Sequence, residues 1–289
     1  MSNVDLISWV GASKTETELQ FRQAIHTIVS AMAADGELAD MSFMKGGILL
    51  ALRYHSPRYT QDIDFSTPKG WSQEEADHLV KRLSRGLAEA VDRLGYELDC
   101  KIQSAKPDPK PKETFTHFWI NLKVSIGYAK RGSRDHKNLM RNQARRAVQM
   151  DYSFDERVPT KDIFQVGSDG LLRVYALTTL IAEKYRAMLQ QVSRDRARRQ
   201  DVFDLYFLLS NYDLRSDECR LEVLEVLRMK AEDRGVDVTQ NAIANPEVIE
   251  RARKEYPSLA NELDEGILPA FDQCYSVVRA YYEELPWEA

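Results

Sequence analysis

Apolar residues at helical spacing mark the first long element of the chain. Between Glu16 and Ala34 they recur every three or four residues, the period at which side chains share one face of a helix. Asp35-Gly36 ends this pattern. A second long helix is predicted between Ser72, which opens a Ser-x-x-Glu capping box, and Gly95, a residue type that commonly ends helices. Its repeating apolar residues are Leu79, Leu83, Leu87 and Val91.

Short segments rich in apolar, β-branched and aromatic residues predict strands beside these helices. A short apolar helix is expected over Ile48–Tyr54, and a Pro/Lys loop over residues 106–112 separates the last two strands. The predicted strands are Phe43-Met44, Asp62–Ser66, Tyr96–Ile102 and Phe115–Tyr128. Together these elements predict an α/β (α+β) core with a small mixed sheet.

The second half of the chain carries almost only helical patterns. We place the domain boundary near Asp169-Gly170, which gives a core domain of residues 1–169 and a helical domain of residues 170–289. The helices expected after the boundary are Leu177–Gln191, Asp201–Ser210, Leu221–Lys230, Pro246–Glu255 and Pro269–Glu284.

Composition limits the kind of protein that this can be. The chain has 289 residues and a formal net charge of -5. No apolar run approaches the roughly 20 residues of a membrane span, and the first residues do not resemble a secretion signal, so we expect a cytoplasmic protein. Cys100, Cys219 and Cys274 are far apart and without Cys-x-x-Cys spacing, which argues against a disulfide framework or a zinc site.

Basic residues are concentrated in two clusters. Such patches on an acidic protein can bind RNA through its phosphates, although charged helix faces are as often only solvated. The first cluster comprises Lys130, Arg131, Arg134, His136, Lys137, Arg141, Arg145 and Arg146. The second comprises Lys184, Arg186, Arg194, Arg196, Arg198 and Arg199.

A pair of acids and a pair of glycines carry the candidate chemistry. Alternate side chains of a strand share a face, so Asp62 and Asp64 point the same way. Carboxylate oxygens suit Mg²⁺, which commonly takes one or two carboxylates and completes its shell with phosphates and water. Gly46-Gly47 opens the short helix, whose unpaired first amides suit a phosphate oxygen. This order of features predicts a metal-dependent phosphoryl-transfer site.

These residues resemble the nucleotidyltransferases of the DNA polymerase β superfamily, whose signature is Gly-Gly or Gly-Ser followed by Asp-x-Asp. The local text, Lys45-Gly46-Gly47 and then Arg58-Tyr59-Thr60-Gln61-Asp62-Ile63-Asp64-Phe65, is similar to the AbiEii family of nucleotidyltransferase toxins. A second block agrees with it. Glu183-Lys184-Tyr185-Arg186-Ala187 and Arg199-Gln200-Asp201-Val202-Phe203-Asp204-Leu205-Tyr206 resemble that family's Glu-Lys-x-x-Ala and Arg-Asp-x-x-Asp-Leu-Tyr segments, with Gln200 as an additional residue.

The resemblance implies a polymerase-β-like core and Mg²⁺-dependent (or Mn²⁺-dependent) transfer of a nucleoside monophosphate from an NTP, with release of pyrophosphate. The implied acceptor is RNA, with the 3′ end of tRNA as the candidate, and the implied setting is a toxin-antitoxin or abortive-infection system with an antitoxin partner. The implied metal ligands are Asp62 and Asp64, which with Lys184 and Asp201 are also the implied catalytic residues. The implied nucleotide-binding residues are Lys45, Gly46, Gly47, Arg58, Thr60 and Lys184.

Two points stay open in the sequence. A third acid is expected on the strand Trp119–Ile126, where Ser125 stands instead, and this departure leaves a degenerate, non-catalytic nucleotide-binding protein as an alternative. A small molecule or a protein hydroxyl is the alternative acceptor. Asp201 and Asp204 are spaced i, i+3 and share a helix face, so spacing does not separate the functional acid from an ordinary ion-pair partner.

Overall fold

The computed structural model describes residues 2–109, 120–195 and 197–288 and divides the chain into two units. The first unit comprises Met1–Arg53 and Thr60–Tyr175, and the second comprises Tyr54–Tyr59 and Ala176–Ala289. The division after Tyr175 differs from the boundary expected near Asp169-Gly170. Those two residues lie where two paired antiparallel strands of the first unit meet, and cutting there would separate the strands.

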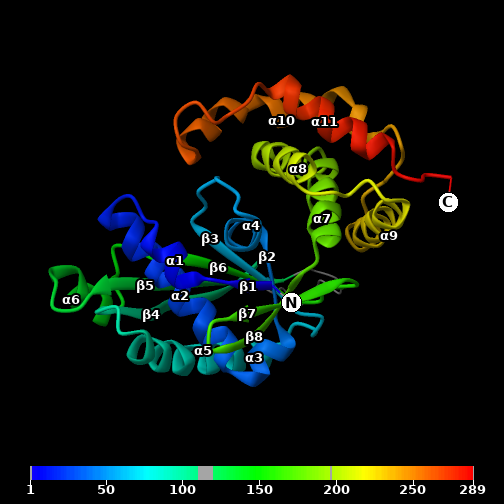
Figure 1. Cartoon of the computed structure of the whole chain (residues 1–289). Coiled ribbons are helices and arrows are strands. Elements are labelled where there is room, and N and C mark those ends of the chain that lie inside the picture. Colours follow the sequence, from blue (N-terminus) through cyan, green and yellow to red (C-terminus); the bar gives the residue numbers. More distant parts are fainter. Residues whose placement is uncertain (1, 110–119, 196, 289) are drawn as a thin grey trace. The chain divides into compact units, whose positions relative to one another are not determined.

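A mixed sheet of eight strands forms the first unit, in the order β1-β7-β8-β2-β3-β6-β5-β4 (Figure 1). Three pairs are parallel (β1 with β7, β2 with β8, β3 with β6), and the other four pairs are antiparallel. The expected mixed sheet is thus confirmed. The strands are β1 (Ser2–Val4), β2 (Phe43–Lys45), β3 (Asp62–Ser66), β4 (Leu98–Asp108), β5 (Asn121–Lys130), β6 (Ala147–Ser153), β7 (Lys161–Val166) and β8 (Gly170–Tyr175).

Helices cover the apolar face of this sheet. On β5, Leu122, Val124 and Ile126 are buried, whereas Lys123 between them is exposed, so the two faces of the sheet differ sharply in polarity. Helix α2 packs against five of the strands and against α5, which Figure 1 shows in teal along the sheet. The helices of this unit are α1 (Leu6–Gly11), α2 (Glu16–Ala34), α3 (Gly36–Met41), α4 (Gly46–Tyr54), α5 (Gln73–Leu94) and α6 (Arg134–Met140).

The two predicted long helices form where their capping residues placed them. Thr15 and Ser72 accept hydrogen bonds from the amides of Glu18 and Glu75 at the starts of α2 and α5. Gly95 ends α5 in the left-handed conformation, with φ +65°. Local capping therefore sets the limits of the two helices that pack against the sheet.

The strand predictions were partly right. β2 and β3 form as expected, but β4 runs to Asp108, so Lys106 belongs to a strand and not to a loop. Pro107 and Asp108 also belong to β4. Residues 110–112 of the expected loop lie outside the described residues, as do Trp119 and the expected start of the next strand at Phe115. β6, β7 and β8 were not predicted.

Five α-helices and two short 3₁₀ segments build the described part of the second unit, as the helical patterns indicated (Figure 1). Tyr185 on the first of these helices packs its ring against the rings of Tyr281 and Tyr282 on the last one. Within the described ranges, no helix is both long and apolar enough to cross a membrane. The helices are α7 (Leu177–Gln190), α8 (Arg199–Asn211), α9 (Asp217–Arg234), α10 (Pro246–Lys254) and α11 (Phe271–Glu283), with η1 (Ala242–Ala244) and η2 (Tyr256–Glu262).

The cap of α5 provides a test of this local account. Ser72→Ala removes the acceptor for the amide of Glu75 and should lower the free energy of unfolding by about 1 kcal/mol. Ser72→Gly should cost only a few tenths of a kcal/mol, roughly, since glycine is also accepted at an N-cap. Urea titration followed by circular dichroism measures both, and equal losses in the two variants would contradict the capping role.

Candidate active site

The acids of the sequence motif lie on β3, in the middle of the sheet. Asp62 and Asp64 alternate with the fully buried Ile63 and Phe65, so both carboxylates stand on the face opposite the packed helices. β3 runs parallel to β6, and this pairing sets Asp64 directly opposite Asp151. Three carboxylates from two adjacent strands therefore share one face of the sheet.

Asp151 is the acid that sequence reasoning missed. The expected strand, β5, does not touch β3; Ser125 pairs instead with Gln149 of β6, one strand further out. The placement of the third acid at Ser125 was therefore wrong, because β6 and not β5 is the neighbour of β3. A signal for β6 was present in the sequence: Val148, Met150 and Tyr152 alternate with polar residues, as in a strand with one buried face.

Burial raises the pKa of two of these acids. Partial burial raises the pKa of Asp62 and the negative charge of Asp151 raises it further, whereas the charge of Lys123 opposes both effects. Burial also raises the pKa of Asp151, and Lys123 and Lys45 counteract this rise. Clustered carboxylates with this pattern are typical of a site that gains stability when a cation binds.

The donor set fits a magnesium ion that arrives with a nucleotide. Within residues 2–109, 120–195 and 197–288, no three His, Cys, Asp or Glu side chains already converge on one point as a finished metal cage. Mg²⁺ does not need such a cage, because one or two carboxylates with phosphate and water oxygens satisfy it. Asp62, Asp64 and Asp151 supply hard oxygen ligands of that kind and at least that number.

Gly46 and Gly47 lie where β2 becomes α4. Gly46 adopts φ +76°, and a Cβ atom on it would lie 1.9 Å from Oδ2 of Asp64. Glycine is therefore required at this position for two reasons: the left-handed backbone conformation and the close approach of the Asp64 carboxylate. The first amides of α4 are next to the acids across the β2–β3 pair, in which Lys45 is opposite Asp64.

Lys45 is held by a buried carboxylate. Its Nζ donates to Oε2 of Glu156 at 2.5 Å and more weakly to Oγ of Ser153 at 3.4 Å. The hydroxyl of Tyr175 donates to the other oxygen of Glu156 at 2.8 Å. The ammonium group is thus fixed beside the acids, and a direct bond from Lys45 to a nucleotide phosphate stays a prediction.

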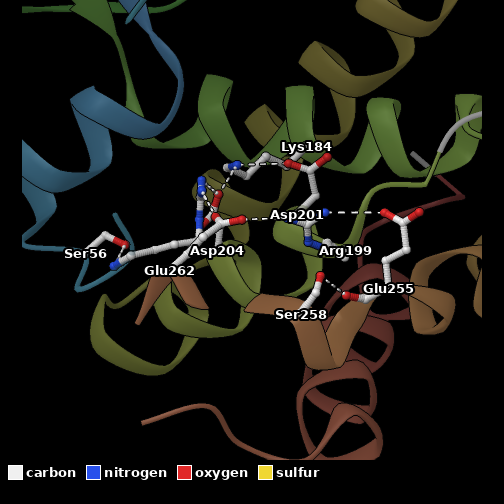
Figure 2. A network of polar contacts seen from close by, with 9 residues as sticks. Ser56, Lys184, Arg199, Asp201, Asp204, Glu255, Ser258 and Glu262 are labelled. Atoms are coloured by element: carbon white, nitrogen blue, oxygen red, sulfur yellow. Dashed lines mark hydrogen bonds and ion pairs between the residues drawn. The ribbon is translucent and has the colours of Figure 1, made fainter. Parts of the chain in front are cut away.

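Lys184 and Asp201 meet in the second unit, as Figure 2 shows. Nζ of Lys184 donates to Oδ1 of Asp201 at 3.0 Å and to Oδ2 of Asp204 at 2.6 Å. All three side chains are buried, and Asp204 is completely inaccessible. Burial disfavours the charge on Lys184, but the two carboxylates outweigh burial and raise its pKa. The shared helix face of the two acids thus serves to bind one lysine.

Arg58 lies in this same buried cluster. It binds Asp204 through two parallel bonds, from Nε to Oδ1 at 2.8 Å and from Nη2 to Oδ2 at 2.9 Å, and a third bond of 3.0 Å runs from Nη1 to Glu262. Arg58 precedes β3 and belongs to the segment Tyr54–Tyr59 of the second unit, whereas Thr60 belongs to the first. Both residues precede the strand, because β3 begins at Asp62 as the sequence predicts.

Asp201 and Asp204 differ in how many of their carboxylate oxygens already accept a hydrogen bond. Asp204 receives bonds from Arg58 and Lys184 on both oxygens, and these charges outweigh its burial and hold its pKa to about 2. Asp201 receives one bond on Oδ1, while its Oδ2 is buried without a hydrogen-bond partner among the described residues. Asp204 is thus a saturated structural carboxylate, and Asp201 retains an acceptor atom.

Many residues of the basic clusters already have acidic partners. Arg131 and His136 both bind Asp99, and Arg199 binds Glu262 at 2.6 Å. Arg196 lies outside the described residues. Much of the charge that the sequence presents as two RNA-binding patches is therefore used inside the protein.

Comparisons with known proteins bear on the family and the fold of the chain. Residues 28–277 match the family model described as "Nucleotidyl transferase AbiEii toxin, Type IV TA system". The fold is similar to that of JHP933 from Helicobacter pylori (TM-score 0.52, 15% identity, 94% of this chain and 92% of that chain). It is also similar to MenT4, a nucleotidyltransferase toxin from Mycobacterium tuberculosis H37Rv (TM-score 0.51, 14% identity, 96% of this chain and 87% of that chain). A comparison with curated proteins gave no match.

The crowding at Gly46 leads to a prediction. Gly46→Ala places a Cβ against the carboxylate of Asp64 and forces a side chain into the left-handed region, so it should lower the free energy of unfolding by about 1–2 kcal/mol and abolish transfer from a labelled NTP. Gly36→Ala is the matched control, because nothing lies within 4 Å of the added carbon and φ is not positive. Full activity in Gly46→Ala would contradict the account.

The buried cluster leads to a second prediction. Asp204→Asn leaves Arg58 and Lys184 buried without their shared carboxylate and should destabilise the protein by about 3–5 kcal/mol in urea titrations. The pKa of Asp204 falls from 3.8 to about 2 on folding. The difference in the free energy of unfolding between the native protein and Asp204→Asn should therefore be complete above about pH 4 and become smaller as the pH falls towards 2. Asp237→Asn, at an exposed carboxyl, should change stability by less than about 0.5 kcal/mol.

Proposed function

Because the chain belongs to the AbiEii family of nucleotidyltransferase toxins, we propose that it transfers a nucleoside monophosphate from an NTP to an RNA acceptor and releases pyrophosphate. One observation supports this most directly: Asp62, Asp64 and Asp151 share a sheet face beside the glycine turn that opens α4. Acids that bind metal and amides that bind phosphate are the two parts that phosphoryl transfer needs.

In this proposal, different residues bind the metal ion and the phosphates of the NTP. Asp62, Asp64 and Asp151 hold Mg²⁺ or Mn²⁺, which when bound neutralises charge on the reacting phosphate. The amides of Gly46 and Gly47 bind phosphate oxygens of the NTP, helped by the positive end of the α4 dipole. The Asp64 carboxylate, which packs against the backbone of Gly46, keeps the metal and the phosphates in register.

Lys184 and Asp201 are proposed to take part in the same reaction from the helical unit. Their positions match the second block of the family resemblance. Oδ2 of Asp201 accepts no hydrogen bond from a described residue and among these residues has only Arg198 as an ion-pair partner, at 4.0 Å, whereas both oxygens of Asp204 accept hydrogen bonds. Arg58 has a different part in this proposal. Its three bonds to Asp204 and Glu262 occupy the guanidinium, so it holds the carboxylate that positions Lys184 and does not grip a phosphate.

The biological setting follows from the family. We propose an acceptor of RNA, with the 3′ end of tRNA as the candidate, a cytoplasmic site of action and an antitoxin protein that neutralises the activity. Ser125 in place of an acid motivates a non-catalytic alternative; in this proposal Asp151, opposite Asp64, is the third acid instead. A small-molecule or protein hydroxyl remains the alternative acceptor class.

One incubation separates these acceptors. The protein is mixed with each of the four NTPs, labelled at the α-phosphate, together with Mg²⁺ and either total RNA, a protein extract or a mixture of small hydroxyl compounds. We expect label in the RNA fraction and none when Mg²⁺ is chelated. Label only in protein or small molecules would replace the RNA proposal, and no transfer under any condition would refute the activity.

The identity of the third acid gives the sharpest test of the site. Asp151→Asn keeps the size of the side chain but removes a metal-binding charge, so transfer should fall by at least roughly a hundredfold. Ser125→Ala should leave the rate within about twofold, because Ser125 pairs with Gln149 and not with β3. If the effects were reversed, with Ser125 essential and Asp151 dispensable, this assignment would be wrong.

A further inference from the structure

A row of charged side chains crosses the sheet from its outer strand to the acids. Lys106 on β4 is opposite Lys123 on β5, Lys123 is opposite Asp151 on β6, and Asp151 is opposite Asp64 on β3. Neighbouring strands lie about 4.8 Å apart, so the backbone at Lys123 is roughly 10 Å and that at Lys106 roughly 14 Å from the backbone at Asp64. The row therefore leads from two lysines directly to the reacting centre.

The two lysines form an unfavourable pair. Like charges directly opposite each other across an antiparallel pair repel, and both side chains are exposed, so no packing requirement explains them. Asp108 offsets part of this repulsion through a half-exposed ion pair of 2.6 Å with Lys123. Lys106 has no ion pair with any residue that the structure describes. An anion between the two ammonium groups would relieve the repulsion that remains.

The position of this pair distinguishes it from the phosphate site of the nucleotide. In the strand order β2-β3-β6-β5-β4, the glycine turn follows β2, on one side of the acid-bearing strands. The lysines are on β5 and β4, on the other side. A phosphate at the lysines is thus separated from the glycine turn by the acids themselves, and it belongs to the second substrate.

We propose that Lys106 and Lys123 bind the phosphodiester backbone near the 3′ end of an RNA acceptor, whose terminal hydroxyl then lies at Asp62, Asp64 and Asp151. This rests on the proposed function and assigns the acceptor to one side of the sheet. A phosphodiester supplies a counter-anion for Lys106 beside Lys123, which already has Asp108 as a partner, and the row of paired residues leads from the outer strand to the acids. Asp108 competes with the RNA for Lys123.

The test measures binding apart from chemistry. Binding of a short, fluorescently labelled single-stranded RNA with a free 3′ hydroxyl is followed by anisotropy at several salt concentrations, for the whole protein and for Lys106→Ala/Lys123→Ala. The double variant should bind about tenfold more weakly at low salt, and the slope of log affinity against log salt should become shallower by about 1.4, roughly 0.7 for each lost phosphate contact. In transfer assays KM for RNA should rise and KM for the NTP should not.

A second variant moves the affinity in the opposite direction. Asp108→Asn removes the competing carboxylate of Lys123 and should tighten RNA binding about two- to fivefold. A variant that had merely lost part of its fold would not bind RNA more tightly. The matched control for charge is Lys81→Ala/Lys254→Ala, which removes two exposed lysines from α5 and α10 and should leave the low-salt affinity close to that of the native protein.

The possible outcomes separate this inference from the proposed function. If the lysine variant and the control bind RNA equally, or if the lysine variant raises KM for the NTP and not for RNA, the assignment of these lysines to the acceptor is overturned. If the native protein transfers nothing to any acceptor, the proposed function fails, while the anisotropy measurements still report on the lysines independently.

Discussion

The parallel pairing of β3 with β6 is the interaction on which the candidate site depends. It sets Asp64 opposite Asp151 and gathers three carboxylates on one face of the sheet, where the charge of Asp151 raises the pKa of Asp62. The opposite face of the same strands is fully apolar and packs against helices, so the strands cannot slip by one residue without burying the acids. The core that stabilises the sheet therefore also fixes which carboxylates meet, because a slip by one residue would turn Asp62 and Asp64 towards the buried face.

Two different arrangements of charge serve the two units. At the sheet, acids are gathered with incomplete compensation, as is expected where a cation and a polyphosphate are to be bound. In the helical unit, Arg58, Asp204 and Lys184 compensate each other closely, and the buried charges are stable only as a set. The acids of the sheet thus keep an unbalanced negative charge, whereas the charges of the helical cluster are balanced among themselves.

Local signals in the sequence predicted most of the elements, because capping residues and helical spacing act within a few residues of chain. Ser72 and Gly95 determined the ends of α5, and the alternation around Asp62 gave β3 its correct limits. Strand order is a long-range property, however, and no local pattern indicates that β6 and not β5 is the neighbour of β3. The strand order accounts for the misplaced third acid. The buried contact of Arg58 with Asp204 could not be predicted from residue spacing either, because the two residues are far apart in the sequence.

The short segment Tyr54–Tyr59 gives the chain an unusual connectivity. The polypeptide leaves the first unit after Arg53, contributes this segment to the second unit, and returns at Thr60 before it leaves again after Tyr175. Arg58 and the backbone amide of Tyr59, which donates to the carbonyl of Glu262, bind the excursion to residues that occur far later in the sequence. During synthesis on the ribosome, the glycine turn and Asp62 are made long before the partners of Arg58 exist. Arg58 can therefore form its bonds to Asp204 and Glu262 only once the segments that carry these two acids have been synthesised.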